Sequence, residues 1–292
     1  MPSVRDFFSL VKFSHTIFAL PFALLGFTLG TIDRGRFDPL VLLLVLGCMV
    51  FARSAAMAFN RYLDRDIDKL NPRTAVRDIP AGRISANSAL VFVLINCALF
   101  ILCTAFINQL VLALSPVALL VILGYSYTKR FTPLCHFVLG LGLSLAPVGA
   151  YLAVTASWAW LPVLYGAVVL IWVSGFDIVY ALQDEEFDRG QSLQSIPTAL
   201  GRDGALRLGR SLHLLCALLL TTTLWWQMTN QYPNRSGWLT FLAGTVFIAL
   251  LFRQHTLVKA NDLSRIDLAF FTTNGLASLL FGALLILDLL LH

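Results

Sequence analysis

Nine apolar runs divide the sequence, and each has about the length needed to cross a lipid bilayer. A helix of about 20 mostly apolar residues spans the hydrocarbon core. Hydrophobic residues make up 58% of the chain and charged residues 13%, whereas average soluble domains have about 45–50% and about 25%, so a soluble fold could not bury the excess. The sequence therefore predicts an all-α, polytopic membrane bundle of about nine transmembrane helices, in a single domain covering 1–292. The runs occupy residues 14–32, 39–62, 87–107, 110–127, 134–154, 160–182, 208–229, 236–252 and 268–291. If the short break at Asn108 and Gln109 does not interrupt a helix, the count falls to eight.

The basic residues predict the orientation of these spans. With nine spans, 17 of the 21 Lys and Arg fall on the side of the N-terminus, and only Arg34, Arg36 and Arg235 fall on the other. Basic loops are retained in the cytoplasm, so we expect a cytoplasmic N-terminus, with His292 outside. Basic loops beside anionic lipid account for the net charge of +5, and no nucleic-acid partner is needed to explain it.

The acidic residues are concentrated in two segments, each at the cytoplasmic end of an apolar run. Ten of the 16 acids lie there, namely Asp64, Asp66, Asp68, Asp78, Asp177, Asp184, Glu185, Glu186, Asp188 and Asp203. On continuing helices, residues four apart share a face. One face would carry Asn60, Asp64 and Asp68, and the other Asp177, Tyr180 or Gln183, Asp184 and Asp188. Carboxylates so placed repel one another, which indicates a bound cation.

Oxygen-only ligands with no nearby His or Cys suit Mg²⁺. Two carboxylate clusters with magnesium are typical of a diphosphate site, and basic residues of the same loops could bind the phosphates. The candidate diphosphate-binding residues are Arg53, Arg73, Arg77, Lys129 and Arg130. Arg53 shares the helical face of Asn60 two turns deeper, where a charged side chain must face a polar cavity. Asp66, Glu185 and Glu186 are interpreted as solvated, because Asp66 points about 200° away from Asp64.

Two motifs and a basic loop carry a resemblance to a known family. The segment NRYLDRDIDKLNPRTAVRDIPAGRIS contains N-x-x-x-D-x-x-x-D followed by R-T-x-x-R, and DIVYALQDEEFDRGQSLQSIPTALG contains Y-x-x-x-D-x-x-x-D followed by S-I-P. With YSYTKRFTP and HTIFALPFALLG, these segments resemble the UbiA superfamily of intramembrane prenyltransferases nearly from end to end.

The resemblance implies a bundle of nine helices around a central cavity, with both acidic motifs at its cytoplasmic mouth under cap loops at about 63–86 and 183–207. It implies catalytic roles for Asp64, Asp68, Asp184 and Asp188, which with Asn60 would hold Mg²⁺. Asp177, Tyr180 and Gln183 would line the substrate pocket. Gln183 departs from the family pattern, because many relatives carry Lys there, and this puts the phosphate contacts on that side in doubt.

The resemblance also implies a reaction. The chain would transfer a polyprenyl group from polyprenyl diphosphate, taken laterally from the lipid bilayer, to an aromatic acid acceptor. The first expectation is 4-hydroxybenzoate, in ubiquinone biosynthesis at the bacterial plasma (inner) membrane, with the active site on the cytoplasmic side. A naphthoate of menaquinone biosynthesis is the alternative acceptor. A multipass transporter with acidic cytoplasmic gates is the alternative of another class.

Overall fold

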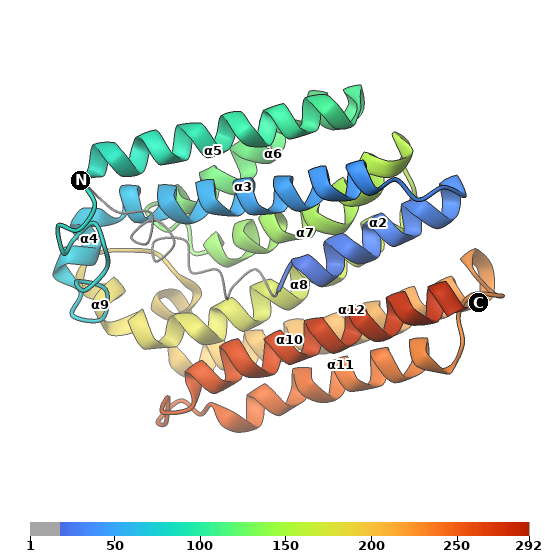
Figure 1. Ribbon diagram of the computed structural model, residues 1–292. Helices are drawn as coiled ribbons and strands as arrows, with labels where there is room; N and C mark the ends of the chain where they lie inside the picture. Colours follow the sequence, from blue (N-terminus) through green and yellow to red (C-terminus); the bar gives the residue numbers. More distant parts are fainter. Residues whose placement is uncertain (1–17, 292) are drawn as a thin grey trace.

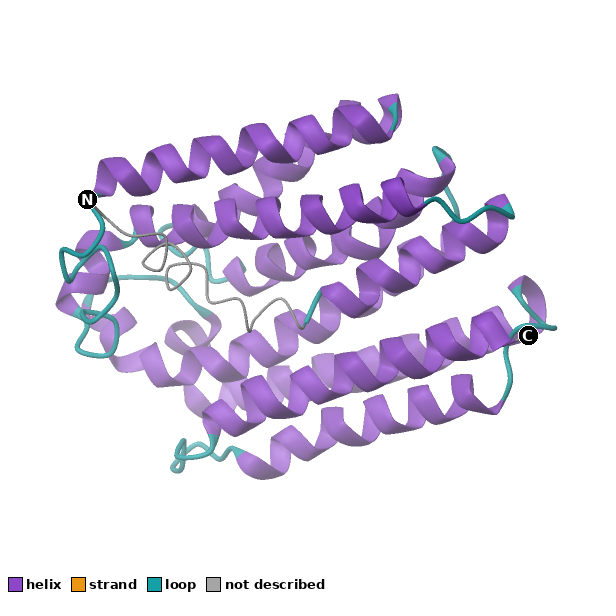
Figure 2. Ribbon diagram, in the orientation of Figure 1, coloured by secondary structure: helices purple, strands orange, loops and turns teal. Residues whose placement is uncertain are grey.

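The computed structural model describes residues 18–291, and its regular structure is helical, with no β-strand among these residues (Figure 2). The start of the first apolar run, the basic residues Arg5 and Lys12, and His292 lie outside the described residues, so the orientation of the N-terminus stays a prediction. The helices are α2 (Leu20–Arg34), α3 (Pro39–Leu63), α4 (Arg65–Leu70), α5 (Ala86–Ile107), α6 (Gln109–Thr128), α7 (Cys135–Thr155), α8 (Trp160–Tyr180), the 3-10 turn η2 (Ala181–Asp184), α9 (Glu185–Gly190), α10 (Ile196–Trp226), the π turn η3 (Gln227–Gln231), α11 (Trp238–Leu257), the π turn η4 (Leu268–Thr273) and α12 (Asn274–Leu291).

Each predicted apolar run contains one long helix. Eight helical segments within the described part are long and apolar enough to cross a membrane. The remaining run, 14–32, contains α2, which is described over 15 residues. The helices lie side by side along one common direction (Figure 1). A bundle of about nine transmembrane helices is thereby confirmed.

A single residue separates α5 from α6. Asn108 is in an extended conformation, and its side-chain oxygen accepts a hydrogen bond from the amide of Val111. Its side-chain nitrogen donates to the carbonyl oxygens of Leu152 and Ala153 in α7, at 2.9 and 3.1 Å. The side chain thus caps α6 and ties the turn to a third helix, which is why so short a break reverses the chain.

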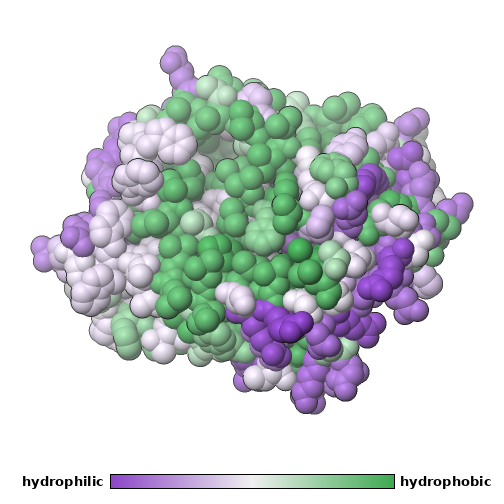
Figure 3. All heavy atoms as spheres, turned by 180° about the vertical axis from the view of Figure 1, so that it is seen from behind, coloured by the Kyte–Doolittle hydropathy of each residue, from purple (hydrophilic) through white to green (hydrophobic). Residues whose placement is uncertain are grey.

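The two ends of the bundle have different side chains. The short helices α4 and α9 lie together at one end, here called the mouth (Figure 1). Seen from behind, strongly hydrophilic side chains gather toward that end, and a broad apolar surface covers the middle (Figure 3). The opposite end of the spans carries the exposed tryptophans Trp158, Trp160, Trp225 and Trp238, a residue type enriched at membrane interfaces. This distribution fits an integral membrane protein.

The predicted cap loops contain more helix than expected. The first, 63–86, includes α4, and the second, 183–207, includes α9 and the start of α10. Ser195 begins α10 with a capping box, in which its side chain accepts from the amide of Thr198. Gly201, at φ +68°, kinks the helix one turn later. The apolar run at 208–229 identified only the part of α10 beyond this kink.

Candidate active site

The first acidic motif crosses a helix junction without losing its register. Although α3 ends at Leu63, the amide of Asp64 donates to the carbonyl of Asn60 at 2.9 Å, and the amide of Asp68 donates to that of Asp64 at 2.7 Å. Helical spacing therefore continues from α3 into α4. Asp64 and Asp68 are 2% and 4% exposed, whereas the side chain of Asp66 is 85% exposed. The predicted face is correct, and so is the solvated position of Asp66.

The second motif follows a tighter path. Between α8 and α9, residues 181–184 form a 3-10 turn, which has three residues per turn instead of 3.6. This turn rotates Asp184 relative to the face that a continuous helix would give. Asp188 is half-buried on α9, within electrostatic reach of Asp184 and Lys129. Gln183 folds back to donate to the carbonyl of Tyr180 at 3.0 Å, and the Tyr180 ring stacks on Phe270 with centroids 3.9 Å apart.

Basic side chains from a third segment hold Asp64. Lys129 Nζ lies 2.7 Å from Asp64 Oδ2, and Arg130 Nη2 lies 2.9 Å from Asp64 Oδ1. Arg130 also donates to the carbonyl oxygens of Leu63 and Ser126, both at 3.0 Å. Asn60 donates to Asp64 Oδ2 at 3.2 Å. The loop after α6 thus supplies the charge that offsets the most buried carboxylate of the motif.

The loop after α4 connects the two motifs. Arg77 Nη1 lies 2.6 Å from Asp68 Oδ1, and Arg73 forms an ion pair with Asp184 through its Nε and Nη2 atoms. Asn71 also donates to Asp184, at 3.3 Å. Burial alone would lower the pKa of Arg73, but the hydrogen bond and charge of Asp184 outweigh it and raise the pKa above its ordinary value. Arg73 is therefore a permanent cation bridging the acidic segments.

Two other acids make structural ion pairs within this end. Asp78 accepts from Arg83 Nε at 2.8 Å, closing the loop on itself. Glu185, interpreted from sequence as solvated, has a side chain only 12% exposed and accepts from Arg189 and Arg202. That interpretation of Glu185 is wrong, because α10 begins earlier than the apolar run and brings Arg202 against α9.

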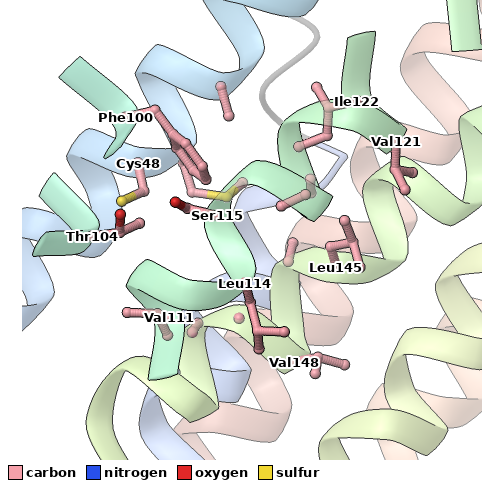
Figure 4. A pocket seen from close by; sticks show the side chains of 18 of the residues that line it. Cys48, Phe100, Thr104, Val111, Leu114, Ser115, Val121, Ile122, Leu145 and Val148 are labelled. Carbon is pink, nitrogen blue, oxygen red and sulfur yellow. The ribbon is translucent and has the colours of Figure 1, made fainter. Parts of the chain in front are cut away.

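A cavity of about 440 Å³ lies within the spans, between α3, α5, α6 and α7. Side chains from these helices converge on it (Figure 4). Its walls are mostly small or aliphatic, including Cys48, Leu114, Ser115, Val121 and Leu145. Aromatic residues contribute little to this wall, since the cluster around Phe22 and Trp172 packs elsewhere in the bundle.

Arg53 lies on the wall of this cavity, not among the carboxylates. It lines the cavity with Tyr125, and its Nε and Nη2 atoms are buried without a hydrogen-bond partner. The sequence correctly predicted that it faces inward. Its place among the diphosphate-binding residues stays a prediction.

Within residues 18–291, no three His, Cys, Asp or Glu side chains converge as a metal site. The reason is visible in the pairing, since Asp64, Asp68 and Asp184 are each turned toward Lys or Arg. The donor set nevertheless fits Mg²⁺, which prefers carboxylate oxygens. Asp68 Oδ2 is buried with no partner, so one ligand position on the first motif is open.

Sequence reasoning missed three residues of this end. Asp177 pairs with His136, a histidine 41 positions away that no sequence pattern connects with it. Arg61, counted only as a cytoplasmic basic residue, is 7% exposed and interacts electrostatically with Asp68. Asn71 was not singled out. No local spacing connects His136 with Asp177 or Asn71 with Asp184, because these contacts join distant segments. Arg61 and Asp68 are seven positions apart on a continuing helical register, so the helical spacing could have linked them.

The fold and the site together define an all-helical integral membrane protein with a charged mouth over an apolar cavity. Residues 19–276 match the UbiA prenyltransferase family. The chain belongs to this family, as its two acidic motifs indicated.

Relatives and solved structures agree with this placement. The chain is 31% identical over 249 residues to a 4-hydroxybenzoate octaprenyltransferase from Aliivibrio salmonicida, covering 84% of this chain and 82% of that protein. It is 30% identical to one from Nitrosomonas europaea, covering 86% and 84%. The apo structure of a UbiA homolog from Aeropyrum pernix K1 superposes with a TM-score of 0.82 at 32% identity, covering 94% of this chain and 98% of that one. A UbiA homolog from Archaeoglobus fulgidus bound to GPP and Mg²⁺ has the same fold, with a TM-score of 0.75 at 20% identity, covering 97% and 99%.

Proposed function

We propose that this prenyltransferase transfers a polyprenyl group from a polyprenyl diphosphate to 4-hydroxybenzoate, in ubiquinone biosynthesis, with Mg²⁺ as its cofactor. The observation that carries the proposal is the charged mouth over a cavity with an aliphatic wall. The relatives named as 4-hydroxybenzoate octaprenyltransferases support the acceptor. Family membership favours the enzyme over the transporter considered from the sequence.

The diphosphate end of the donor substrate would bind at the mouth. Asn60, Asp64 and Asp68 would hold one Mg²⁺, and Asp184 and Asp188 the other. When bound, the metal neutralises charge on the leaving diphosphate. Four basic side chains that are now paired with these carboxylates would pair with phosphate oxygens instead, namely Arg73, Arg77, Lys129 and Arg130. Such a swap keeps every buried charge paired, which matters because an unpaired buried charge is strongly destabilising.

The prenyl chain would occupy the cavity. Because each CH₂ group transferred from water to an apolar site contributes about 0.8 kcal/mol, a long tail favours a site inside the bilayer. The dry wall also excludes water from the allylic carbon as its bond to the diphosphate breaks. The aromatic ring then attacks that carbon and loses a proton.

Arg53 would bind the carboxylate of the aromatic acid. Its two buried donor atoms lack partners, and a carboxylate accepts from a guanidinium through two parallel hydrogen bonds. We propose this contact in place of the diphosphate contact predicted for Arg53, because it accounts for the position of Arg53 on the cavity wall. A naphthoate with a carboxylate on its ring would use the same contact, so it remains the alternative acceptor.

The whole chain would act as one transmembrane domain, with residues 63–86 and 183–207 capping the mouth. We propose that the mouth faces the cytoplasm of a bacterial inner membrane. The excess of Lys and Arg around the mouth supports this side, and the tryptophans at the other end fit the outer interface.

The test uses the purified chain in lipid nanodiscs, with a labelled polyprenyl diphosphate and a panel of 4-hydroxybenzoate, a dihydroxynaphthoate and benzoate. We expect prenylated 4-hydroxybenzoate, loss of turnover on chelation of divalent cations, and recovery with Mg²⁺. Preference for the naphthoate would replace the acceptor, and no transfer to any member of the panel would refute the proposal.

Asp64→Asn tests the mouth. The change removes a negative charge that faces Lys129 and Arg130, and with it a proposed metal ligand. Losing the metal's stabilisation of the transition state costs several kcal/mol, so we expect kcat to fall on the order of 10³-fold. Asp66→Asn is the matched control, because that side chain is exposed on the other face, and its rate should stay within about twofold. Equal losses in the two variants would show that the buried face is not the site.

A further inference from the structure

Asp177 differs from the other paired carboxylates of the mouth in the partner that holds it. Lys or Arg side chains hold Asp64, Asp68 and Asp184. Asp177 Oδ2 instead lies 2.7 Å from His136 Nδ1. Its side chain is 21% exposed, and that of His136 is 4% exposed. Asp177 therefore keeps a reachable carboxylate at this end without a permanent cation against it.

The hydrogen bonds of His136 indicate which of its ring nitrogens carries a proton. His136 Nε2 lies 3.3 Å from the amide nitrogen of Ile196, at the start of α10. A backbone amide only donates, so Nε2 carries a lone pair. In neutral imidazole the proton is then on Nδ1 and is donated to Asp177. The hydrogen bond thus orients the carboxylate while leaving it negative.

The pair of His136 and Asp177 lies next to residues that line the cavity. Leu139, one turn beyond His136 on α7, lines the cavity, as does Tyr125 on α6. Both Asp64 and Asp177 interact electrostatically with Tyr125. Asp177 therefore lies where the charged mouth meets the cavity wall. Its Oδ1 atom makes no hydrogen bond to a described residue, so it is the open face of the pair.

We propose that Asp177 accepts the proton that the aromatic ring loses, and that His136 is the residue that positions it. The inference rests on the proposed function. The ring carbon next to the phenolic hydroxyl forms a bond with the allylic carbon, whose bond to oxygen breaks and leaves its electron pair on the diphosphate. The electron pair of the ring C–H bond returns to the ring, and the proton passes to Asp177 Oδ1.

The pairing suits this step for a physical reason. An Arg or Lys facing Asp177 would permanently stabilise its charged form and weaken it as a base, whereas an imidazole, which is not a permanent cation, holds it in place at less cost in basicity. The partial exposure of Asp177 gives the proton a route to water at the mouth. On α8, the Ser174 hydroxyl donates to the carbonyl of Leu170 at 2.7 Å and to that of His136 at 3.3 Å, and no hydrogen bond joins it to the His136 ring.

The experiment compares 4-hydroxybenzoate with the same acid deuterated at the ring carbons next to the hydroxyl. In the unchanged protein we expect no isotope effect on kcat, because proton loss is fast. Asp177→Asn should lower kcat about 10²-fold or more and reveal an isotope effect clearly above one. His136→Phe should lower kcat about tenfold or more, with the same isotope effect and little change in KM.

His136→Asn separates positioning from packing, because an asparagine amide can replace the Nδ1 donor. We expect it to restore most of the rate that His136→Phe loses. Ser174→Ala is the matched control, since it deletes a neighbouring hydrogen bond and should keep the rate and an isotope effect of one. Thermal unfolding of each variant shows whether it folds. If His136→Phe does not fold, the test rests on Asp177→Asn, which keeps the shape of the side chain.

The inference is overturned if Asp177→Asn keeps its rate or loses it with an isotope effect of one. It is also overturned for His136 if the Asn and Phe variants behave alike. Absence of turnover in the unchanged protein would instead refute the proposed function, so the two failures are distinguishable.

Discussion

The two sides of the bundle are both built from apolar helices but bury them to different extents. We call α3, α5, α6 and α7 the cavity half, and α8, α10, α11 and α12 the packed half. In three of the four spans of the cavity half only 22% of residues are buried, and in α7 44%. The spans of the packed half range from 39% to 61%. Hydrophobicity alone therefore does not decide how closely membrane helices pack.

The difference comes from the side chains that face inward. In the packed half, Trp172 contacts Phe22, Phe176 and Phe247, with ring centroids 5.1 to 5.7 Å apart. In the cavity half the inward positions are mostly small or aliphatic residues, which leave about 440 Å³ unfilled. A catalyst for a long apolar substrate needs both, namely a space for the substrate and a rigid wall that keeps the mouth in register.

Truncating one aromatic residue in each half should give the largest change in the free energy of unfolding. Trp172→Ala removes a fully buried ring and its hydrogen bond to Asn274, and should lower the free energy of unfolding by about 3 kcal/mol. Phe100→Ala removes a ring that already borders the cavity and so has fewer contacts to lose, and it should lower the free energy of unfolding by only about 2 kcal/mol. Unfolding in detergent measures both. Equal losses would show that the cavity half is as tightly packed as the other.

Two glycines on α7 test the boundary between the halves. A methyl group on Gly140 would lie 2.5 Å from the carbonyl oxygen of Leu170 in α8, whereas one on Gly142 would meet nothing within 4 Å. Gly140→Ala should therefore be destabilising by about 2 kcal/mol. Gly142→Ala should be neutral or stabilising by up to about 1 kcal/mol. Thermal unfolding compares them, and a stable Gly140→Ala variant would contradict the close approach of α7 and α8.

The smallest effect concerns polar contacts that support the cavity half. Asn108→Ala removes the cap of α6 and two hydrogen bonds to α7, so we expect a loss of about 1.5 kcal/mol. Ser85→Ala removes only an exposed cap of α5 and should cost about 0.5 kcal/mol. If chemical denaturation gave the same value for both, the contacts of Asn108 with α7 would contribute nothing.

Much of the fold could be predicted because membrane helices satisfy local rules. The nine apolar runs predicted the helices, since a bilayer admits only segments that satisfy their own backbone hydrogen bonds. The four-residue spacing predicted that Asp64 and Asp68 share a buried face while Asp66 does not. The prediction was less accurate after Tyr180, because a 3-10 turn and a helix that begins early have no hydropathy signal.

The sequence by itself thus determined the number of spans, the family and the acids that gather at the mouth. The spans follow from the lengths of the apolar runs, the shared face of the acids from their four-residue spacing, and the family from the resemblance of the two motifs. Only the tertiary structure decided that Lys129 and Arg130 pair with Asp64, that Arg73 bridges to Asp184, that the cavity lies among α3, α5, α6 and α7, and that His136 holds Asp177. These contacts join residues 41 to 111 positions apart, and their partners are set by how the helices pack, which no local pattern encodes.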